Sequence, residues 1–402
     1  MTRFCKSLPV LEADVAVVGA GPSGATTALL LARAGRQVVL IDRARFPRDK
    51  ACGEGLMPPG VEVLRRLGLY EAVIATGARP VQGVRYQHPG GHPKAYASFP
   101  PPPDGGAAWG LGIRRTSFDA ALLEAVRQEP RATVIEGLRV TGLMRGPSGD
   151  VSGLTTSGDT VRAHLVIGAD GLHSKIRTWA GLGKPSRPHR RFGLAGHWRV
   201  DTSDRDALLI TLANGHEWYE APVGPMELLV SVLDGRSHSR VTARTYEATA
   251  RHSVPAVRNA ELVSGPLGGA QFHQRTRGVA AGRVFLVGDA TGYDDPTTGD
   301  GLAIGMLLAE RLAEHVDALL GGSISPRVAA ARYKADHGSL VRDRRRLTRL
   351  VLVQDRSQWL SRRAIAQAGR DPRTLSRLLA INCGYERFRN LSPRDWLSLA
   401  GI

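Results

Sequence analysis

The pattern of hydrophobic and polar positions follows two regimes, and the first is a repeated strand–helix order near the N-terminus. An apolar run at residues 15–18 is typical of a buried parallel strand. A helix rich in Ala and Leu follows and ends at Gly35, and a second apolar strand at 37–41 stops at Asp42. Helical spacing of apolar residues returns at 59–69 and again at 113–128. This order predicts a parallel sheet covered by helices.

Between residue 184 and about residue 278 the pattern changes to strands alone. Four segments, at 192–200, 207–212, 216–221 and 227–233, alternate or run apolar and predict an antiparallel sheet. Residues 79–106 are rich in Pro, Gly and His and indicate an excursion toward the same sheet. A helix at 240–251 is expected beside it. Beyond Pro326 the pattern is helical, with a break at Pro372.

Together these patterns predict an α/β fold with a doubly wound, Rossmann-type dinucleotide domain. An antiparallel β-sheet substrate domain interrupts it, and a C-terminal helical region follows. We expect the first domain to be discontinuous and to comprise residues 14–78, 107–183 and 279–325. The sheet domain would comprise 79–106 and 184–278, and the helical region 326–402.

A glycine-rich turn joins the first strand to the first helix. Gly19 would allow the tight turn, Gly21 would let the backbone approach a pyrophosphate, and Gly24 would let helix and strand pack closely. The free N–H groups of the helix start would face the phosphates. Asp42, at the end of the second strand, would accept hydrogen bonds from ribose hydroxyls. Strand, glycines, helix and acid therefore predict an adenine dinucleotide.

Two later blocks indicate which dinucleotide is bound. An apolar strand at 284–287 ends at Gly288 and Asp289, whose carboxylate can bond the ribityl chain of FAD. A Pro/Gly-rich loop follows, and the N–H groups of 299–301 at the next helix start can face an electron-rich flavin ring edge. Between these ends, residues 166–171 form a strand that stops at Asp170 and Gly171.

These three blocks as a set resemble the FAD-dependent monooxygenase superfamily of the para-hydroxybenzoate hydroxylase type, over residues 14–314. Geranylgeranyl reductases and flavin halogenases are relatives, and Cys52-Gly53-Glu54 resembles their branch, where this segment passes beside the flavin. Glu54 would either contact a polar flavin edge or cap the helix beginning near Pro58. The resemblance also implies that Arg115 lies along the FAD pyrophosphate. The cofactor-binding residues expected are Gly19, Gly21, Pro22, Ser23, Gly24, Asp42, Arg43, Cys52, Gly53, Glu54, Arg115, Val140, Asp170, Gly288, Asp289, Pro296, Gly299 and Gly301.

Catalytic candidates come from the strand at 216–222 and from Pro296. Alternation places Glu217 and Tyr219 on one face of that strand and Trp218 and Glu220 on the other. If the first pair faces the pocket, it could orient a substrate and accept its proton; otherwise it is a surface Glu and a packing Tyr. Trp198, His197 and His273 are similar candidates, although aromatic residues on such a sheet are more often part of the core. No metal site is expected.

The same strand separates the relatives by motif. At this strand the halogenases have the motif Trp-x-Trp-x-Ile-Pro, and the prenyl reductases have Tyr-x-Trp-x-Phe-Pro. Of either motif, residues 217–222 keep only the proline, Pro222. We therefore expect an NAD(P)H-dependent monooxygenase that inserts oxygen from O2 into a small, natural-product-like molecule through a flavin C4a-hydroperoxide. A carboxylate on each strand face also disfavours a prenyl chain. The alternatives are a geranylgeranyl-reductase-like isoprenoid double-bond reductase and a non-catalytic flavin-bearing subunit.

The composition narrows the partners. The formal net charge is +17, which reflects either an Arg bias on solvated faces or an acidic partner such as an acidic or carrier-tethered substrate, NADPH or anionic lipid. No nucleic-acid-binding motif accompanies the charge, so no nucleic acid is expected. No long apolar run exists, so we expect no transmembrane segment, although membrane-surface contact stays open. Three scattered cysteines fit a cytoplasmic protein.

Overall fold

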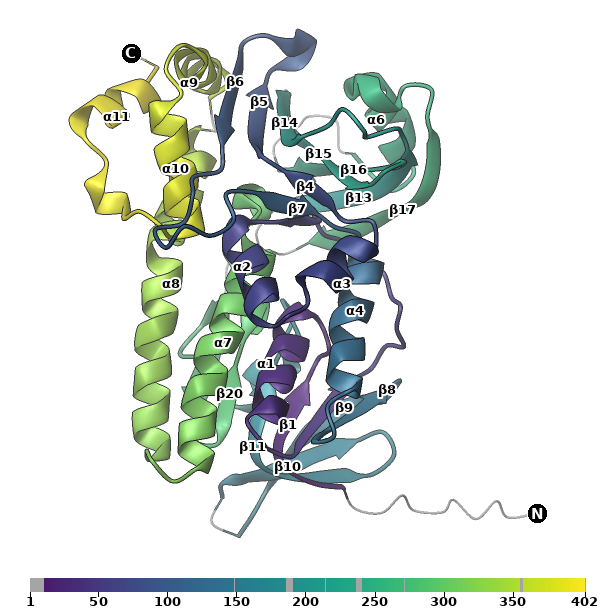
Figure 1. Cartoon of the computed structure of the whole chain (residues 1–402), viewed down its shortest axis with the longest axis vertical. Coiled ribbons are helices and arrows are strands. Elements are labelled where there is room, and N and C mark those ends of the chain that lie inside the picture. Colours follow the sequence, from purple (N-terminus) through teal and green to yellow (C-terminus); the bar gives the residue numbers. More distant parts are fainter. Residues whose placement is uncertain are drawn as a thin grey trace.

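Two large sheets and a set of C-terminal helices make up the chain (Figure 1). The computed structural model describes residues 11–147, 149–185, 191–213, 215–235, 241–270, 272–354 and 357–401. It confirms the predicted α/β class, with a Rossmann-type sheet, a second sheet and a helical C-terminus.

In the first sheet β1 lies between β11 and β2, and it runs parallel to both. Its strand order is β19-β20-β11-β1-β2-β8, with the antiparallel pair β9 and β10 attached to β11. Val15 and Val17 face one apolar cluster while Ala16 and Val18 face the other, so the strand is buried on both sides. Its strands are β1 (Leu11–Val18), β2 (Val38–Asp42), β8 (Ala132–Glu136), β9 (Val140–Arg145), β10 (Val151–Thr156), β11 (Thr160–Gly168), β19 (Ala280–Ala281) and β20 (Val284–Leu286).

Different elements cover the two faces of this sheet. Long helices pack on the Val15 face, whereas the β9–β10 pair and a short helix pack on the Ala16 face. Gly24 and Gly305 let α1 and α7 lie close to their neighbours, since a Cβ at Gly305 would stand 2.3 Å from Ser23 Oγ. The helices are α1 (Pro22–Arg33), α2 (Pro58–Arg66), α3 (Tyr70–Ala75), α4 (Arg115–Arg127), α5 (Lys175–Trp179) and α7 (Gly301–Leu320).

The second sheet has the order β17-β13-β16-β15-β14-β5-β6 and is antiparallel except at one pair. That pair, β5 with β14, is parallel because β5 comes from the excursion at residues 79–106. The helix expected at 240–251 begins later, as α6 (Tyr246–Ser253), and residues 236–240 lie outside the described chain. The strands are β5 (Gly83–Gln87), β6 (Lys94–Ser98), β13 (Phe192–Arg199), β14 (Ala207–Ala213), β15 (His216–Gly224), β16 (Glu227–Asp234) and β17 (Glu261–Ala270).

Short elements connect these sheets. A three-stranded sheet, β3-β7-β4, lies beside α2, and a two-stranded sheet pairs β12 with β18. Their bounds are β3 (Gly55–Leu56), β4 (Arg79–Val81), β7 (Gly110–Gly112), β12 (Gly183–Lys184) and β18 (Arg275–Thr276). Single 3-10 turns are η1 (Pro89–Gly91), η2 (Pro255–Val257), η3 (Gly288–Thr291), η4 (Pro296–Thr298) and η5 (Phe388–Asn390).

The C-terminal region is helical, as predicted, and breaks at Pro372. α8 runs along α7, and α9 and α10 pack against β6 at the end of the second sheet (Figure 1). The helices are α8 (Pro326–Gln354), α9 (Gln358–Arg370), α10 (Arg373–Cys383) and α11 (Pro393–Leu399). Within the part of the chain that the structure describes, none of these or the other helices is long and apolar enough to cross a bilayer.

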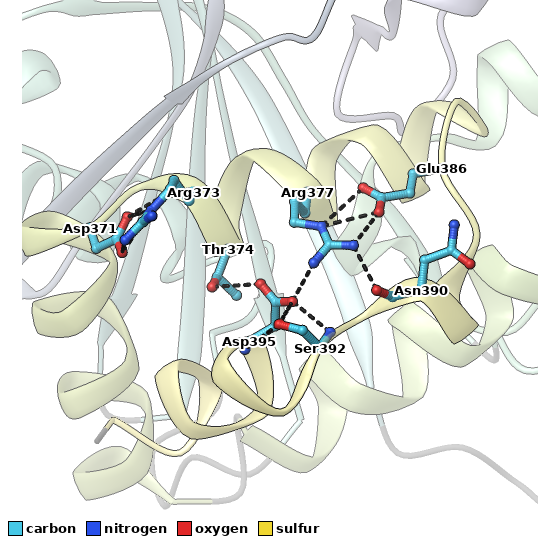
Figure 2. A network of polar contacts seen from close by, with 8 residues as sticks. All are labelled: Asp371, Arg373, Thr374, Arg377, Glu386, Asn390, Ser392 and Asp395. Atoms are coloured by element: carbon cyan, nitrogen blue, oxygen red, sulfur yellow. Dashed lines mark hydrogen bonds and ion pairs between the residues drawn. The ribbon is translucent and has the colours of Figure 1, made fainter.

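A partly exposed polar network fixes α10 and α11 to each other (Figure 2). The guanidinium of Arg377 on α10 binds the carboxylates of Glu386 and Asp395 and donates to the Asn390 carbonyl at 2.7 Å. Asp395 also accepts the Ser392 N–H at 2.7 Å, which completes a capping box at the start of α11. These bonds give the short α11 a fixed place that its length alone would not provide.

Candidate functional site

A cavity of about 930 Å³ lies between the two sheets and the C-terminal helices. The ends of β1 and β2, the start of α1 and the η4 turn line one side of it. The second sheet forms the opposite wall through residues of β5, β13, β14, β15 and β16, and α8 and α10 close one end. Its volume lies at the upper end of the range of small-molecule and cofactor sites, about 300–1,000 Å³.

The glycine turn has the geometry predicted for it. Gly19 has a φ of +103°, and a Cβ there would lie 2.4 Å from the Ala169 carbonyl oxygen. A Cβ at Gly24 would lie 1.9 Å from the Gly19 carbonyl oxygen, so helix and strand need glycine to meet. At Gly21 the nearest atom to a Cβ would be Arg48 Nη2, at 3.6 Å, and the backbone lines the cavity. This turn therefore leaves room for a ligand at Gly21 only.

Asp42 lines the cavity beside this turn. Its Oδ2 accepts the Ala20 N–H at 2.8 Å, and its Oδ1 accepts the Ala44 N–H at 2.8 Å. Because each carboxylate oxygen has a second lone pair, the fixed carboxylate can still accept hydroxyl hydrogens.

Two arginines near the glycine turn share one buried carboxylate. Arg115 makes a bidentate pair with Asp119, at 2.8 and 2.7 Å, and Arg48 Nη1 lies 3.3 Å from Asp119 Oδ2. Both arginines line the cavity, but Arg48 is the more accessible and lies beside Gly21. The sequence analysis named Arg115 and missed Arg48, whose only signal was its place six residues after Asp42.

Glu54 lines the cavity but its carboxylate has partners that neither expectation named. Oε1 accepts the N–H of Arg115 at 2.8 Å, at the start of α4, and Oε2 lies 2.8 Å from His197 Nε2. The expectation that Glu54 caps α2, which begins at Pro58, was therefore wrong. Glu54 instead accepts a backbone N–H at the start of α4. Its φ of +53° is a strained value for a residue with a Cβ. His197 continues the chain of contacts to Ser264 Oγ at 3.1 Å, so this histidine has a positioning contact and is not merely packed.

The middle of the cavity carries charged groups from three motifs. Asp289 lies 4.0 Å from Lys50 Nζ, and both side chains are partly accessible. Asp170 Oδ2 accepts the N–H groups of Lys175 and Ile176, at 2.7 and 3.1 Å, and thereby caps α5. Its other oxygen, Oδ1, is buried and has no hydrogen-bond partner among the described residues. A ligand hydroxyl would satisfy that oxygen.

Glu217 and Tyr219 do share a face of β15, and it is the face toward the cavity. Tyr219 lines the cavity, but Glu217 lies behind it, almost fully buried, with Oε1 2.5 Å from Arg191 Nη2. The Tyr219 hydroxyl donates to Glu217 Oε2 at 2.7 Å, and Thr297 Oγ1 donates to the same oxygen at 2.9 Å. Glu217 is thus neither a surface residue nor a cavity-lining one: it ties β15 to the η4 turn.

Burial and the charge of Glu217 together raise the pKa of Tyr219 well above its usual value. The same two causes raise the pKa of Tyr86 to about 12. Both phenols line the cavity and therefore stay protonated over the physiological pH range. Neither serves as a base there. Tyr86 can donate a hydrogen bond to a substrate, whereas Tyr219 already donates its proton to Glu217 and can only accept one.

Glu220 alternates with Tyr219 along β15, and it too borders the cavity. Its carboxylate is buried and lies 3.0 Å from Arg205 Nη1. Glu217 and Glu220 are therefore both paired with arginines, and the expected cost of a lone carboxylate beside an apolar substrate does not arise.

The end of the cavity closed by helices is apolar, which the sequence analysis did not foresee. Aliphatic side chains come from the second sheet, from α8 and from α10, and they meet where these elements converge. They are Val84, Leu208, Ile210, Leu347, Val351, Leu375, Leu378 and Leu379, which we call the apolar arm. The helical spacing of Leu375, Leu378 and Leu379 was a visible signal, but it did not show which surface this face covers.

Most of the residues named from the sequence border this one cavity. Those lining it are Gly19, Gly21, Pro22, Ser23, Asp42, Arg43, Cys52, Gly53, Glu54, Arg115, Val140, Asp170, Tyr219, Asp289, Pro296, Gly299 and Gly301. Gly24, Gly288 and Glu217 lie behind the wall and shape it. His273 lies 3.7 Å from Asp294, outside the cavity lining. No cluster of potential metal ligands occurs within the described ranges.

These residues fit an FAD molecule. Gly21 and Arg48 lie where a pyrophosphate meets the N-terminus of α1, and Asp42 offers lone pairs to a ribose. Asp289, Lys50 and the buried oxygen of Asp170 offer polar contacts to a ribityl chain. α7 begins at Gly301, which lines the cavity, so the positive end of this helix faces the cavity. The electron-rich edge of a flavin ring can lie against it.

Comparison with known proteins agrees with this geometry. Residues 12–337 match the family described as "FAD binding domain". The menaquinone reductase of Mycobacterium tuberculosis is 31% identical over 345 residues, which cover 80% of this chain and 81% of that protein. Digeranylgeranylglycerophospholipid reductase 1 of Methanothermobacter thermautotrophicus is 29% identical over 338 residues, covering 80% of this chain and 78% of the relative. The crystal structure of p-nitrophenol 4-monooxygenase PnpA from Pseudomonas putida superposes with a TM-score of 0.80 at 21% identity, over 94% of this chain and 99% of that one.

Proposed function

This chain belongs to the FAD binding domain family of flavin-dependent enzymes, and from that premise we propose that it reduces a double bond of a large, mainly apolar, isoprenoid-like molecule with NAD(P)H. The observation that carries the proposal is the apolar arm, which extends the flavin cavity between β5, β14, α8 and α10. Two relatives that match four-fifths of the chain are named as reductases, and one of those names denotes a prenyl lipid. The non-catalytic alternative has no support from these relatives.

We assign the cofactor site to groups along one wall of the cavity. The α1 N-terminus with Gly21 and Arg48 would hold the pyrophosphate, Asp42 the adenosine ribose, and Asp289 with Lys50 the ribityl chain. Bound there, FAD supplies two-electron chemistry between a nicotinamide and the substrate. Asp289→Ala is expected to lose most of the bound FAD, which absorbance of the purified protein would measure.

The protein groups would orient and enclose the substrate. The second sheet covers the η4 turn and keeps water from the reacting end of the cavity. The Tyr219 hydroxyl, whose proton is donated to Glu217, would accept a hydrogen bond from a polar group of the substrate, and the protonated Tyr86 would donate one. The aliphatic side chains of the apolar arm would take up the substrate chain by burying its surface.

The proposal is tested by turnover with NADPH or NADH under strict exclusion of O2. A prenyl substrate should gain two hydrogens at one double bond, and NAD(P)H should be consumed in equal amount. Absence of a saturated product with a range of prenyl lipids, under conditions in which NAD(P)H reduces the bound FAD, would overturn it.

Oxygen insertion is the second candidate, and one observation favours it. Residues 217–222 depart from the strand motif of the prenyl reductases, keeping only its proline, and this strand faces the reacting end of the cavity. In that case the product would carry one oxygen atom from O2, and no turnover would occur without O2. Labelled O2 and mass spectrometry therefore separate the two reactions.

A further inference from the structure

The C-terminal helices carry a concentration of exposed apolar and basic side chains that the flavin site does not explain. Of the eight exposed large hydrophobic side chains in the described chain, five lie on these helices; apart from Val328 at the start of α8, four lie toward the C-terminal end. They are Val353, Trp359, Trp396 and Leu397, exposed by 52, 63, 44 and 50%. Isolated exposed apolar residues are ordinary, but two tryptophans among four neighbours indicate a contact surface.

Hydrogen bonds bring these residues together although they belong to three helices. Gln354, next to Val353, donates to the Leu399 carbonyl at 3.0 Å, which joins the end of α8 to the end of α11. Arg363 donates to the Gly401 carbonyl at 3.0 Å, which joins α9 to the same end of α11. The Arg363 guanidinium also lies 4.7 Å from the centre of the Trp359 ring. Each of these contacts thus lies within about one helical turn of Val353, Trp359 or Leu397. We call these three residues, together with Trp396, the C-terminal patch.

The charge around the C-terminal patch is predominantly positive. Residues 326–402 hold seventeen Lys and Arg side chains and six Asp and Glu side chains, so +11 of the net charge of +17 lies in this part of the chain. Arg349, one turn before Val353 on α8, and Arg362 on α9 are exposed and have no ion-pair partner among the described residues. An anionic partner is therefore complementary to this surface.

We propose that the C-terminal patch docks the enzyme on an anionic lipid bilayer. Tryptophan beside arginine suits the boundary between head groups and acyl chains, because the ring is apolar and the indole N–H and guanidinium stay hydrated. The inference rests on the proposed function in one respect: α8 and α10, which carry or adjoin the patch, also form the apolar arm, so a membrane-dissolved substrate would meet the cavity where the protein meets the bilayer. A combined apolar and electrostatic contact is what stable peripheral binding needs.

The test measures binding of the FAD-loaded full chain to vesicles without any substrate. Sedimentation should show binding to phosphatidylcholine vesicles that contain about one third phosphatidylglycerol, and about tenfold weaker binding to pure phosphatidylcholine. Raising the salt from about 0.1 M to about 0.5 M should weaken the first. The double variant Trp359→Ser/Leu397→Ser and the double variant Arg349→Gln/Arg362→Gln should each lose about tenfold in affinity.

Matched controls make each outcome informative. Val263→Ser removes an apolar side chain of similar exposure on β17, and Arg162→Gln removes an exposed arginine on β11, so neither should change vesicle binding. Thermal unfolding and FAD content confirm that each variant is folded. Equal binding of patch variants and wild type, or no binding of wild type to anionic vesicles, overturns the proposal. Binding to an acidic carrier protein and not to vesicles also overturns it in favour of a protein partner.

The same preparation keeps this inference separate from the proposed function. Loss of docking with continued reduction of a detergent-dissolved prenyl lipid contradicts docking alone. Docking without any turnover of apolar substrates contradicts the proposed function and leaves docking in place.

Discussion

At the residue scale, two glycines in one turn serve different purposes. Gly24 has the Gly19 carbonyl oxygen where a Cβ would be, whereas Gly21 has only the end of the Arg48 side chain at 3.6 Å. The φ at Gly21 is −70°, which alanine adopts readily. The fold therefore needs Gly24, and the ligand needs Gly21.

These differences predict opposite results for two alanine variants. Gly24→Ala should lower the thermal stability of the FAD-free protein, because backbone atoms cannot move aside cheaply. Gly21→Ala should leave that stability nearly unchanged but weaken FAD affinity by about tenfold or more, since the methyl group enters the cavity beside the pyrophosphate position. Calorimetry of the apoprotein and FAD titration check the two halves. A stable Gly24→Ala apoprotein would contradict the packing argument.

The ion pairs of this chain differ in how deeply they are buried, and their contributions to stability should differ accordingly. Arg191 is buried beside Glu217 and 3.3 Å from Asp295, whereas Arg199 and Glu261 form an exposed pair at 2.8 Å. Arg191→Met should lower the free energy of unfolding by about 3–5 kcal/mol, because buried carboxylates lose their cation. Arg199→Met should cost about 0–1 kcal/mol. Denaturant titration of both variants measures the contrast, and similar small losses would show that the buried pair is not needed.

The sequence predicted these chemical groups better than their partners. The glycine turn, Asp42 and Asp289 could be named because each follows a strand at a fixed spacing within one βαβ unit or one loop. The partners of Glu217 could not, since Arg191 comes from the neighbourhood of another strand and Thr297 from a turn much later in the chain. Glu54 was misplaced for the same reason: the helix it caps, α4, begins far from it in sequence.

At the element scale, periodicity predicted which segments are strands and which are helices, but it did not predict which helix surfaces are buried. α8 is rich in arginine, yet its Tyr333 donates to the Leu286 carbonyl of β20 at 2.8 Å and is fully buried. A single buried stripe within a charged helix is visible as spacing, but the surface it covers is set by tertiary contacts.

His337, one turn after Tyr333 on α8, makes the stability of that helix depend on pH. Burial, and then the charge of Arg345, lower the pKa of His337 to about 4. Between about pH 6.5 and about pH 4 the unfolded chain binds a proton that the folded chain does not, so stability falls as the pH falls through this window, by about 1.4 kcal/mol per pH unit. Below about pH 4 this contribution no longer changes.

Replacing this histidine should reduce the slope, and the part due to His88, whose pKa is also lowered by burial and by Arg362, should remain. His337→Gln is expected to partly flatten the stability profile between about pH 6.5 and about pH 4, whereas His252→Gln, at an exposed position on α6, should leave it unchanged. Denaturant midpoints measured at several pH values provide the check. An unchanged slope in the His337 variant would mean that another buried base controls α8.

At the scale of the whole molecule, the cavity is shared by parts that are far apart in the sequence. The first sheet supplies the groups assigned to FAD, the second sheet the opposite wall, and α8 with α10 the apolar arm. The sequence indicated the first two parts through motifs and alternation. The third could not be predicted, because nothing local marks which helix closes a cavity, and this missing wall is what reversed the expected preference between oxygen insertion and reduction.

Substrate length should therefore depend on α10. Leu375→Phe narrows the apolar arm, so KM should rise about tenfold for long prenyl chains and stay unchanged for short ones, which need not reach α10. Leu340→Phe on α8 is the matched control, since Leu340 packs on the core without lining the cavity and meets a similar cost of overpacking, about 1–3 kcal/mol. FAD affinity should not change in either variant, because the groups assigned to FAD lie on the first sheet and its loops. If Leu375→Phe affects short and long substrates equally, the chain does not lie along α10, and the substrate must be compact enough to fit between the η4 turn and the second sheet.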